Sequence, residues 1–145
     1  KWFEELEVVL VEERPVAIWN KTQLIDKKAH TFVPNEIPKR DWIELEGPED
    51  EKRLMLDRLG EILPTLRRAE IPLKRLALDD RHSWSLELKN GVLVILGSED
   101  FKVRFQRFIN HFQEPDLLER VTSIDFRYKN GFSVKWKDGA SLDKE

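Results

Sequence analysis

The spacing of apolar positions changes several times along the chain, and each spacing predicts a different element. Residues 6–20 are rich in β-branched and aliphatic side chains, and they predict one long strand, or two strands in line, interrupted at Pro15. Because proline cannot donate a ladder hydrogen bond, Pro15 marks an edge, a bulge or a junction between sheets. A turn at Asn20-Lys21 and short strands near residues 23–25 and 31–33 are expected next.

Residues 34–50 carry three of the seven prolines and predict an irregular crossing loop. Residues 51–69 then place apolar side chains at helical intervals, and Pro64 is expected to kink or divide this helix. A second helix is expected after Gly97, with Ser98 as its N-cap and two acids in its first turn. Its apolar stripe is Phe101, Phe105, Phe108, Ile109 and Phe112, and its opposite face is basic, with Lys102, Arg104 and Arg107.

The remaining segments predict hairpins. Residues 73–80 and 83–88 predict strands, the second with strict alternation, and Lys89-Asn90-Gly91 predicts a tight turn between strands. Residues 92–96 are apolar at every position, which predicts a strand covered on both faces. A last hairpin is expected over residues 122–137, with strands at residues 122–128 and 132–137 and a turn at Lys129-Asn130-Gly131. The pattern predicts one α+β domain: a mostly antiparallel sheet of hairpins with two helices packed on one face.

Composition narrows the function. The 145 residues are 40% hydrophobic and 37% charged with a net charge of −3, which argues against a nucleic-acid partner. The chain has no cysteine, so disulfides and thiolate chemistry are excluded. No apolar run approaches the roughly 20 residues of a membrane helix. Because Met55 is the only methionine, we expect a fragment whose targeting or anchoring segment lies upstream.

Candidate catalytic chemistry is sparse. None of the three histidines has a partner at the spacing of a helical metal pair, and no nucleophile elbow or phosphate-binding loop occurs. Asp79, Asp80 and His82 form the tightest acid–imidazole group, which we interpret as surface side chains at a strand end. The chain is therefore expected to be a binding module without cofactor or metal, not an enzyme; a hydrolase using His82 is a distant alternative.

Five segments in order resemble one family. They are residues 11–19 (VEERPVAIW), 45–50 (LEGPED), 82–97 (HSWSLELKNGVLVILG), the helix that follows, and 123–136 (SIDFRYKNGFSVKW). Their order and spacing resemble the FtsQ/DivIB family of bacterial cell-division proteins, in particular the FtsQ type of Gram-negative bacteria.

The resemblance implies a single-pass inner-membrane protein with a POTRA domain and a β domain in the periplasm, at the division septum. On this chain, residues 1–13 match the last POTRA strand, residues 14–138 the β domain, and residues 139–145 a polar tail. The family has no known enzymatic activity and acts as a divisome scaffold. It joins FtsB and FtsL, contacts other divisome proteins through regions missing here, and helps to control septal peptidoglycan synthesis.

The resemblance also implies where FtsB docks. A basic position before the Ser-Trp pair matches Arg81 or His82; the other matching positions are Arg127, Tyr128, Asn130, Gly131, Phe132, Val134 and Trp136.

The residues alone support the same hairpin. A last strand with an uncovered edge can accept a partner strand. Tyr128 and Trp136 are expected to frame a pocket, with Arg127 facing an acidic partner residue. Alternatively, the hairpin is ordinary core, and Lys135 and Lys137 protect its edge. A second functional class also stays open: a domain that binds a small molecule or peptidoglycan fragment in a groove between helices and sheet.

Overall fold

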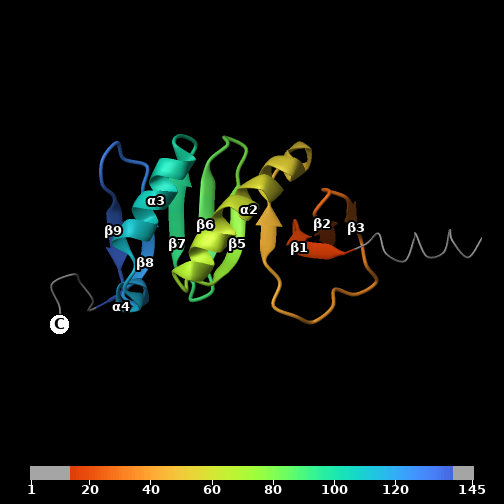
Figure 1. The fold of residues 1–145 in the computed structure, drawn as a ribbon, viewed down its shortest axis with the longest axis horizontal. Coiled ribbons are helices and arrows are strands. Elements are labelled where there is room, and N and C mark those ends of the chain that lie inside the picture. The colour runs from red at the N-terminus through yellow and green to blue at the C-terminus, as the bar shows by residue number, and fades with distance from the viewer. Residues whose placement is uncertain (1–13, 139–145) are drawn as a thin grey trace, which may run out of the picture.

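Nine short strands form one sheet with the order β3-β2-β1-β4-β5-β6-β7-β8-β9 (Figure 1). The computed structural model describes residues 14–138, so the POTRA strand expected in residues 1–13 and the tail in residues 139–145 lie outside the described part. The elements are β1 Pro15–Trp19, β2 Gln23–Asp26, β3 Thr31–Phe32, β4 Glu44–Glu46, η1 Glu49–Glu51, α2 Lys52–Arg68, β5 Leu73–Leu78, β6 Trp84–Leu88, β7 Leu93–Gly97, α3 Phe101–His111, α4 Pro115–Glu119, β8 Val121–Asp125 and β9 Ser133–Trp136.

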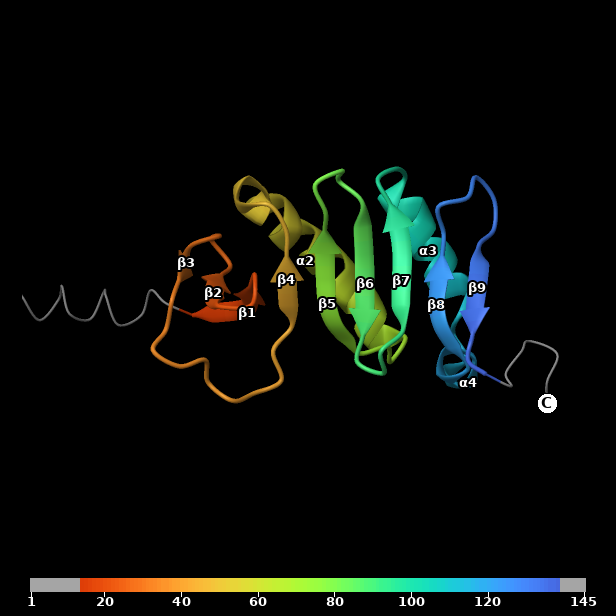
Figure 2. The ribbon, with the colours of Figure 1, turned by 180° about the vertical axis from the view of Figure 1, so that it is seen from behind.

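The sheet is built from two similar units. In the first, β4 connects through α2 to the parallel strand β5, which pairs with β6 antiparallel. In the second, β7 connects through α3 and α4 to the parallel strand β8, which pairs with β9 antiparallel. The β6–β7 hairpin joins the two units. Parallel neighbours need a crossover connection, and the helices provide it. As a result, the β5–β6 and β8–β9 connections lie at the same end of the sheet (Figure 2).

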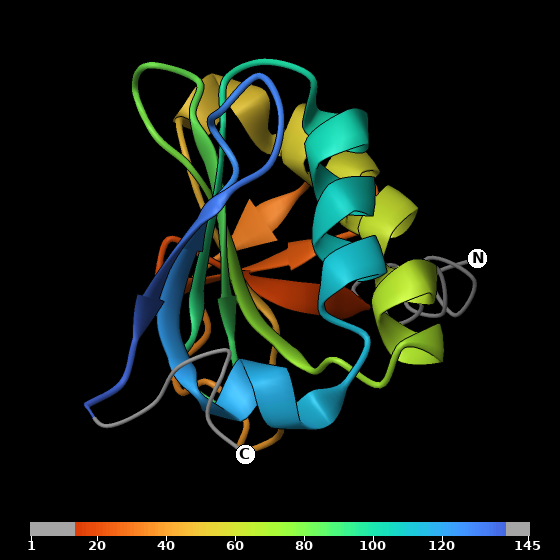
Figure 3. The same cartoon turned by 90° about the vertical axis from the view of Figure 1, so that its left-hand side faces the viewer.

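The helices cover one face of the sheet and leave the other bare (Figure 3). α2 buries Met55, Leu59, Ile62 and Leu66. α3 buries its whole predicted phenylalanine stripe, and Phe108 is fully buried. The α+β prediction, with antiparallel pairs in the majority and both long helices on one face, is confirmed.

The N-terminal strands are largely as predicted. Pro15 begins β1, and the register with β2 shifts between Pro15 and Ala17, which fits the predicted bulge. Asn20 and Lys21 form the turn with φ of 47° and 74°. The crossing-loop prediction is wrong in one place, because Glu44–Glu46 forms β4 between β1 and β5. Three residues carry no strand signal of their own, and pairing with both neighbours stabilises them.

Pro64 does not divide α2, which runs unbroken from Lys52 to Arg68. A proline inside a helix leaves the carbonyl four residues earlier without its donor and crowds it. Here that carbonyl belongs to Gly60, and both residues are on the exposed side of the helix. Water can satisfy such a carbonyl, so Pro64 does not divide the helix, which was one of the two outcomes expected from the sequence.

The start of α3 also differs from the prediction. The N-cap is Asp100 in a left-handed conformation, not Ser98, and the first turn carries no acid. The prediction that Arg104 lies on the exposed face of the helix is wrong. Arg104 is buried, and its Nη1 donates to the Leu96 carbonyl oxygen at 2.7 Å. This bond ties the first turn of α3 to the end of β7.

Residues 92–96 are covered on one face only, contrary to the prediction. Val92, Val94 and Leu96 are buried beneath the helices, whereas Leu93 is exposed and Ile95 is half-buried on the bare face. The continuous apolar run therefore places two aliphatic side chains on the surface.

Candidate partner-binding edge

The last hairpin forms one edge of the sheet. β9 pairs with β8 on one side, and no described strand pairs with its other side (Figure 2). The ladder ends where Asp125 faces Ser133, so residues 126–132, the β8–β9 loop, form a wide connection. Asn130 and Gly131 lie exposed in this loop, with Gly131 at a φ of 83°.

The side chains of β9 are divided between the two faces. Phe132, Val134 and Trp136 are half-buried and pack against the core under the helices. Ser133 and Lys135 are exposed on the other side. The side chains of β9 therefore alternate as in an ordinary hairpin, while the outer edge of its backbone has no described partner.

Tyr128 departs from that pattern because its side chain is 48% exposed. Its hydroxyl donates to Ser133 Oγ at 3.3 Å, next to the start of β9. Trp136 faces Val121 at the far end of the same strand. The two aromatic side chains therefore do not frame one pocket, contrary to the prediction; each offers a separate contact along the hairpin.

Arg127 already has an intramolecular partner. Its Nε donates to Asp125 Oδ1 at 2.9 Å and its Nη2 to Oδ2 at 2.7 Å. These hydrogen bonds hold the pKa of the Asp125 carboxyl below its ordinary value, although partial burial acts in the opposite direction. The Arg127 stem crosses Gly97, where a Cβ would lie 2.8 Å from Cγ. An acidic partner residue would thus have to share Arg127 with Asp125.

Arg81 lies at the same end of the sheet, in residues 79–83, the β5–β6 turn. Asp79 Oδ1 accepts the backbone N–H groups of Arg81 and Ser83 at 2.8 and 2.9 Å, and His82 adopts a φ of 62°. The Arg81 side chain is exposed. One strand, β7, separates the β5–β6 hairpin from β8. A shallow hollow on the bare face connects the two regions, and its lining includes Asp79, Ser83, Ser85, Leu93, Ile95 and Arg127.

Asp79 and His82 of the acid–imidazole group have different partners in the structure. Asp79 binds backbone amides of its own turn, and His82 Nε2 lies 3.4 Å from Glu51 Oε2. Within residues 14–138, no group of three or more histidine, aspartate or glutamate side chains is arranged to hold a metal ion. The interpretation of these residues as surface side chains fits this geometry.

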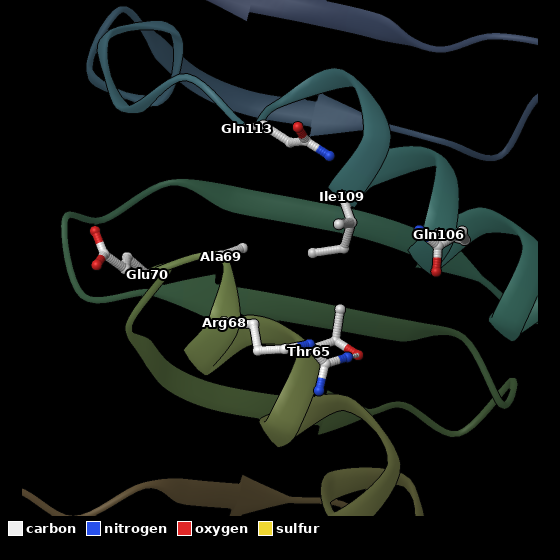
Figure 4. Close-up of a pocket in the computed structure, with 7 residues that line it drawn as sticks. All are labelled: Thr65, Arg68, Ala69, Glu70, Gln106, Ile109 and Gln113. Carbon is white, nitrogen blue, oxygen red and sulfur yellow. Dashed lines mark hydrogen bonds between the residues drawn. The ribbon is translucent and has the colours of Figure 1, made fainter.

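Two hollows bear on the groove suggested for a small molecule. One, of about 220 Å³, lies between the helices and an end of the sheet, and its lining includes Leu88 of β6, Phe112 and Leu118 of α4. The other, an open hollow of about 490 Å³, lies between α2 and α3 (Figure 4). It is lined by Thr65, Arg68, Ala69, Glu70, Gln106, Ile109 and Gln113.

Two residues that shape the β8–β9 loop were not recognised in the sequence as part of the site. Asp125 pairs with Arg127, and Arg107 of α3 donates to backbone carbonyls of the loop. The only local signal was the Asp-x-Arg-Tyr segment, which includes Asp125. Nothing in the helical pattern connects Arg107 with a loop more than 20 residues later in the chain.

No helix in residues 14–138 combines the length and apolar character needed to span a membrane. The described part is an α+β domain with an exposed sheet edge. Residues 17–127 match the family model described as "Cell division protein FtsQ/DivIB, C-terminal". The chain therefore belongs to the FtsQ/DivIB family of cell-division proteins, which confirms the resemblance.

Full-length relatives extend the similarity to the last hairpin, beyond the end of the family match at residue 127. The cell division protein FtsQ of Coxiella burnetii is 31% identical over 147 positions, covering 94% of this chain and 58% of the relative. FtsQ of Escherichia coli K12 is 32% identical over 143 positions, covering 94% and 52%. FtsQ of Shewanella oneidensis is 32% identical over 147 positions, covering 99% and 55%. The chain thus spans about half the length of these relatives.

Proposed function

We propose that this domain is a non-catalytic scaffold of the bacterial divisome that binds FtsB, together with FtsL, through the β8–β9 hairpin. Binding would support and regulate septal peptidoglycan synthesis. The observation that carries the proposal is the exposed edge of β9, at the end of a nine-stranded sheet. Membership in the FtsQ/DivIB family supports a role in cell division.

The edge of β9 is suited to strand addition. An edge strand presents N–H and C=O groups that a partner strand can pair with. Val134 and Trp136 pack against the core, so β9 is held in place while its outer edge stays accessible. Lys135 argues against strand addition, because an exposed lysine on an edge strand discourages indiscriminate pairing. Such a residue still permits a partner with an acidic side chain opposite it.

Two arginines add charge to the surface. Arg127 is engaged by Asp125, whereas the Arg81 side chain has no hydrogen-bond or ion-pair partner among residues 14–138. Arg81 is therefore the more available of the two for an acidic residue of FtsB. The hollow on the bare face extends from residues of the β5–β6 turn to Arg127, and a partner segment could lie along it.

In the cell, the proposal places the domain in the periplasm at the septum, anchored in the inner membrane by a helix upstream of these residues. Other divisome proteins would bind regions outside this chain. Neither a cofactor nor a nucleic acid has a role in this proposal.

Tyr128→Ala tests the proposal most directly. We expect an approximately 30-fold weaker affinity for the periplasmic part of FtsB, because exposed aromatic side chains often dominate interface energy. Isothermal titration with the purified domain measures the affinity, and a thermal melt confirms that the variant is folded. Val33→Ala is the matched control, since Val33 is also exposed, at 74%, but lies after β3 at the opposite edge. Equal binding by the wild type and the folded Tyr128 variant would refute the role of Tyr128.

A second candidate function is the binding of a small molecule or peptidoglycan fragment, favoured by the hollow between α2 and α3 (Figure 4). Its rim carries amide and guanidinium groups from Gln106, Gln113 and Arg68, which suit a sugar or peptide. The two functions use different surfaces. In an NMR titration with a peptidoglycan fragment, this candidate requires movement of the Gln106 and Gln113 signals and none at Tyr128.

A further inference from the structure

Arg107 connects α3 to the β8–β9 loop. Its Nη1 donates to the carbonyl oxygens of Gly131 at 3.2 Å and Tyr128 at 3.4 Å. Its Nη2 donates to the carbonyl oxygen of Lys129 at 3.3 Å. One half-buried guanidinium thus contacts three carbonyls of a loop that has no ladder pairing of its own.

Three carbonyl dipoles that converge on one point repel each other unless a cation lies between them. A guanidinium suits this position because it is planar and carries several donors in a fixed fork. Each of the three bonds is long and therefore weak by itself. Together they hold residues on both sides of the loop tip in one arrangement.

The same bonds fix Tyr128 at two points. Its carbonyl is held by Arg107 and its hydroxyl by Ser133, so the exposed ring has a defined position before any partner arrives. The C-terminal part of α3 contributes as well: the rings of His111 and Phe112 lie 5.1 and 5.4 Å from the Phe132 ring. The loop is therefore anchored by α3 from its start to its end.

We propose that Arg107 is a positioning residue: it contacts no partner itself and holds the β8–β9 loop in the shape that binds. This inference rests on the proposed function, because the loop is the proposed FtsB surface. Without Arg107, the loop would populate several arrangements, and only the competent fraction would bind. The apparent affinity falls in proportion to that fraction.

Arg107→Ala tests the inference in two independent measurements. In the free domain, hydrogen exchange should become faster in residues 128–132 and stay unchanged at Ile124 in β8. With the periplasmic part of FtsB, the affinity should fall about tenfold, mainly through slower productive association, which corresponds to a competent fraction of about one tenth. Arg107→Lys should recover part of both losses, because an ammonium group can satisfy some of the carbonyls.

Lys102→Ala is the matched control, since it removes one exposed positive charge from the same helix without touching the loop. It should leave exchange and affinity unchanged. Unchanged exchange in the Arg107→Ala variant would overturn the inference, as would faster exchange with unchanged affinity. If the wild type does not bind FtsB, the proposed function fails instead, and the exchange measurement alone decides whether Arg107 holds the loop.

Discussion

The β5–β6 turn and the β8–β9 loop follow equivalent strands of the two similar units. An Asp-x-Arg sequence opens the turn, and the same sequence runs from the last residue of β8 into the loop. In each, the aspartate Oδ1 accepts the arginine backbone N–H, at 2.8 Å for Asp79 and Arg81 and at 2.9 Å for Asp125 and Arg127. Both connections lie at the same end of the sheet (Figure 2). The same local hydrogen bond thus ends β5 and β8.

Beyond that bond the two connections diverge. The β5–β6 turn closes on itself, because Asp79 also accepts the Ser83 N–H. The β8–β9 loop has no such closure. It is held by Phe126 in the core and by Arg107 from α3. The short turn is determined by its own residues, whereas the wide loop takes its shape from distant contacts and leaves Tyr128 exposed.

Replacing the residue between the aspartate and the arginine should produce the largest difference in stability between the two connections. Phe126 is fully buried, and its ring lies about 6 Å from those of Phe108 and Phe112. Asp80, its counterpart, is exposed. We expect Phe126→Ala to lower the free energy of unfolding by about 3–5 kcal/mol, because a cavity forms. Asp80→Ala should change it by less than about 0.5 kcal/mol.

Urea unfolding followed by tryptophan fluorescence measures both values. If Phe126→Ala cost no more than Asp80→Ala, the loop would not be anchored through the core, and the contrast between the two connections would be wrong.

Backbone conformation offers a smaller test. His82 in the turn and Gly131 in the loop both have positive φ, 62° and 83°. A Cβ at position 131 meets no atom within 4 Å, so Gly131→Ala isolates the backbone strain. We expect it to cost about 1 kcal/mol, and His82→Gly to be neutral or stabilising by up to about 1 kcal/mol. Thermal unfolding of both variants gives the sign of each change in stability. A stabilised Gly131→Ala variant together with a destabilised His82→Gly variant would contradict this explanation.

The sequence predicted those parts of the fold that depend on neighbouring residues. The phenylalanine stripe of α3 and the Asn90-Gly91 turn follow from spacing and turn chemistry, and both occur as expected. β4 could not be predicted, because three residues in a proline-rich stretch become a strand only through two parallel neighbours. The exposure of Leu93 was missed for a similar reason: an apolar run does not reveal which faces the helices cover.

The candidate partner-binding edge could also be predicted only in part. The position of the hairpin came from the sequence, and the family resemblance added the partner. The predicted turn at residues 129–131 is wrong, because β8 ends at Asp125 and residues 126–132 form a wide loop. The contacts that shape the loop could not be predicted from the sequence, because Arg107 lies 21 to 24 residues from the carbonyls it holds. The pairing of Arg127 with Asp125 could not be predicted either, since local spacing does not distinguish a free arginine from a paired one.

The pairing of Arg127 with Asp125 gives the smallest predicted effect. It should make the stability of the β8–β9 loop, but not that of the β5–β6 turn, depend on pH. Arg127 lowers the pKa of Asp125 below the unfolded value of 3.8. A carboxyl with a lowered pKa in the folded state contributes stability above the unfolded pKa, and this contribution is lost as the pH falls through the folded pKa. The wild type should therefore lose stability below about pH 4 that the Asp125→Asn variant has already lost at pH 7.

The difference should be at most about 1 kcal/mol, because the Arg127 side chain is 56% exposed and solvent screens the pair. Urea unfolding at pH 7 and pH 3 measures it, and Asp80→Asn controls for the removal of one exposed carboxylate from the β5–β6 turn. Between these pH values, Asp125→Asn should show a smaller loss than either the wild type or the control. An equal loss in all three proteins would mean that the ion pair does not stabilise the loop, and Arg127 would then be as available to an acidic partner residue as Arg81.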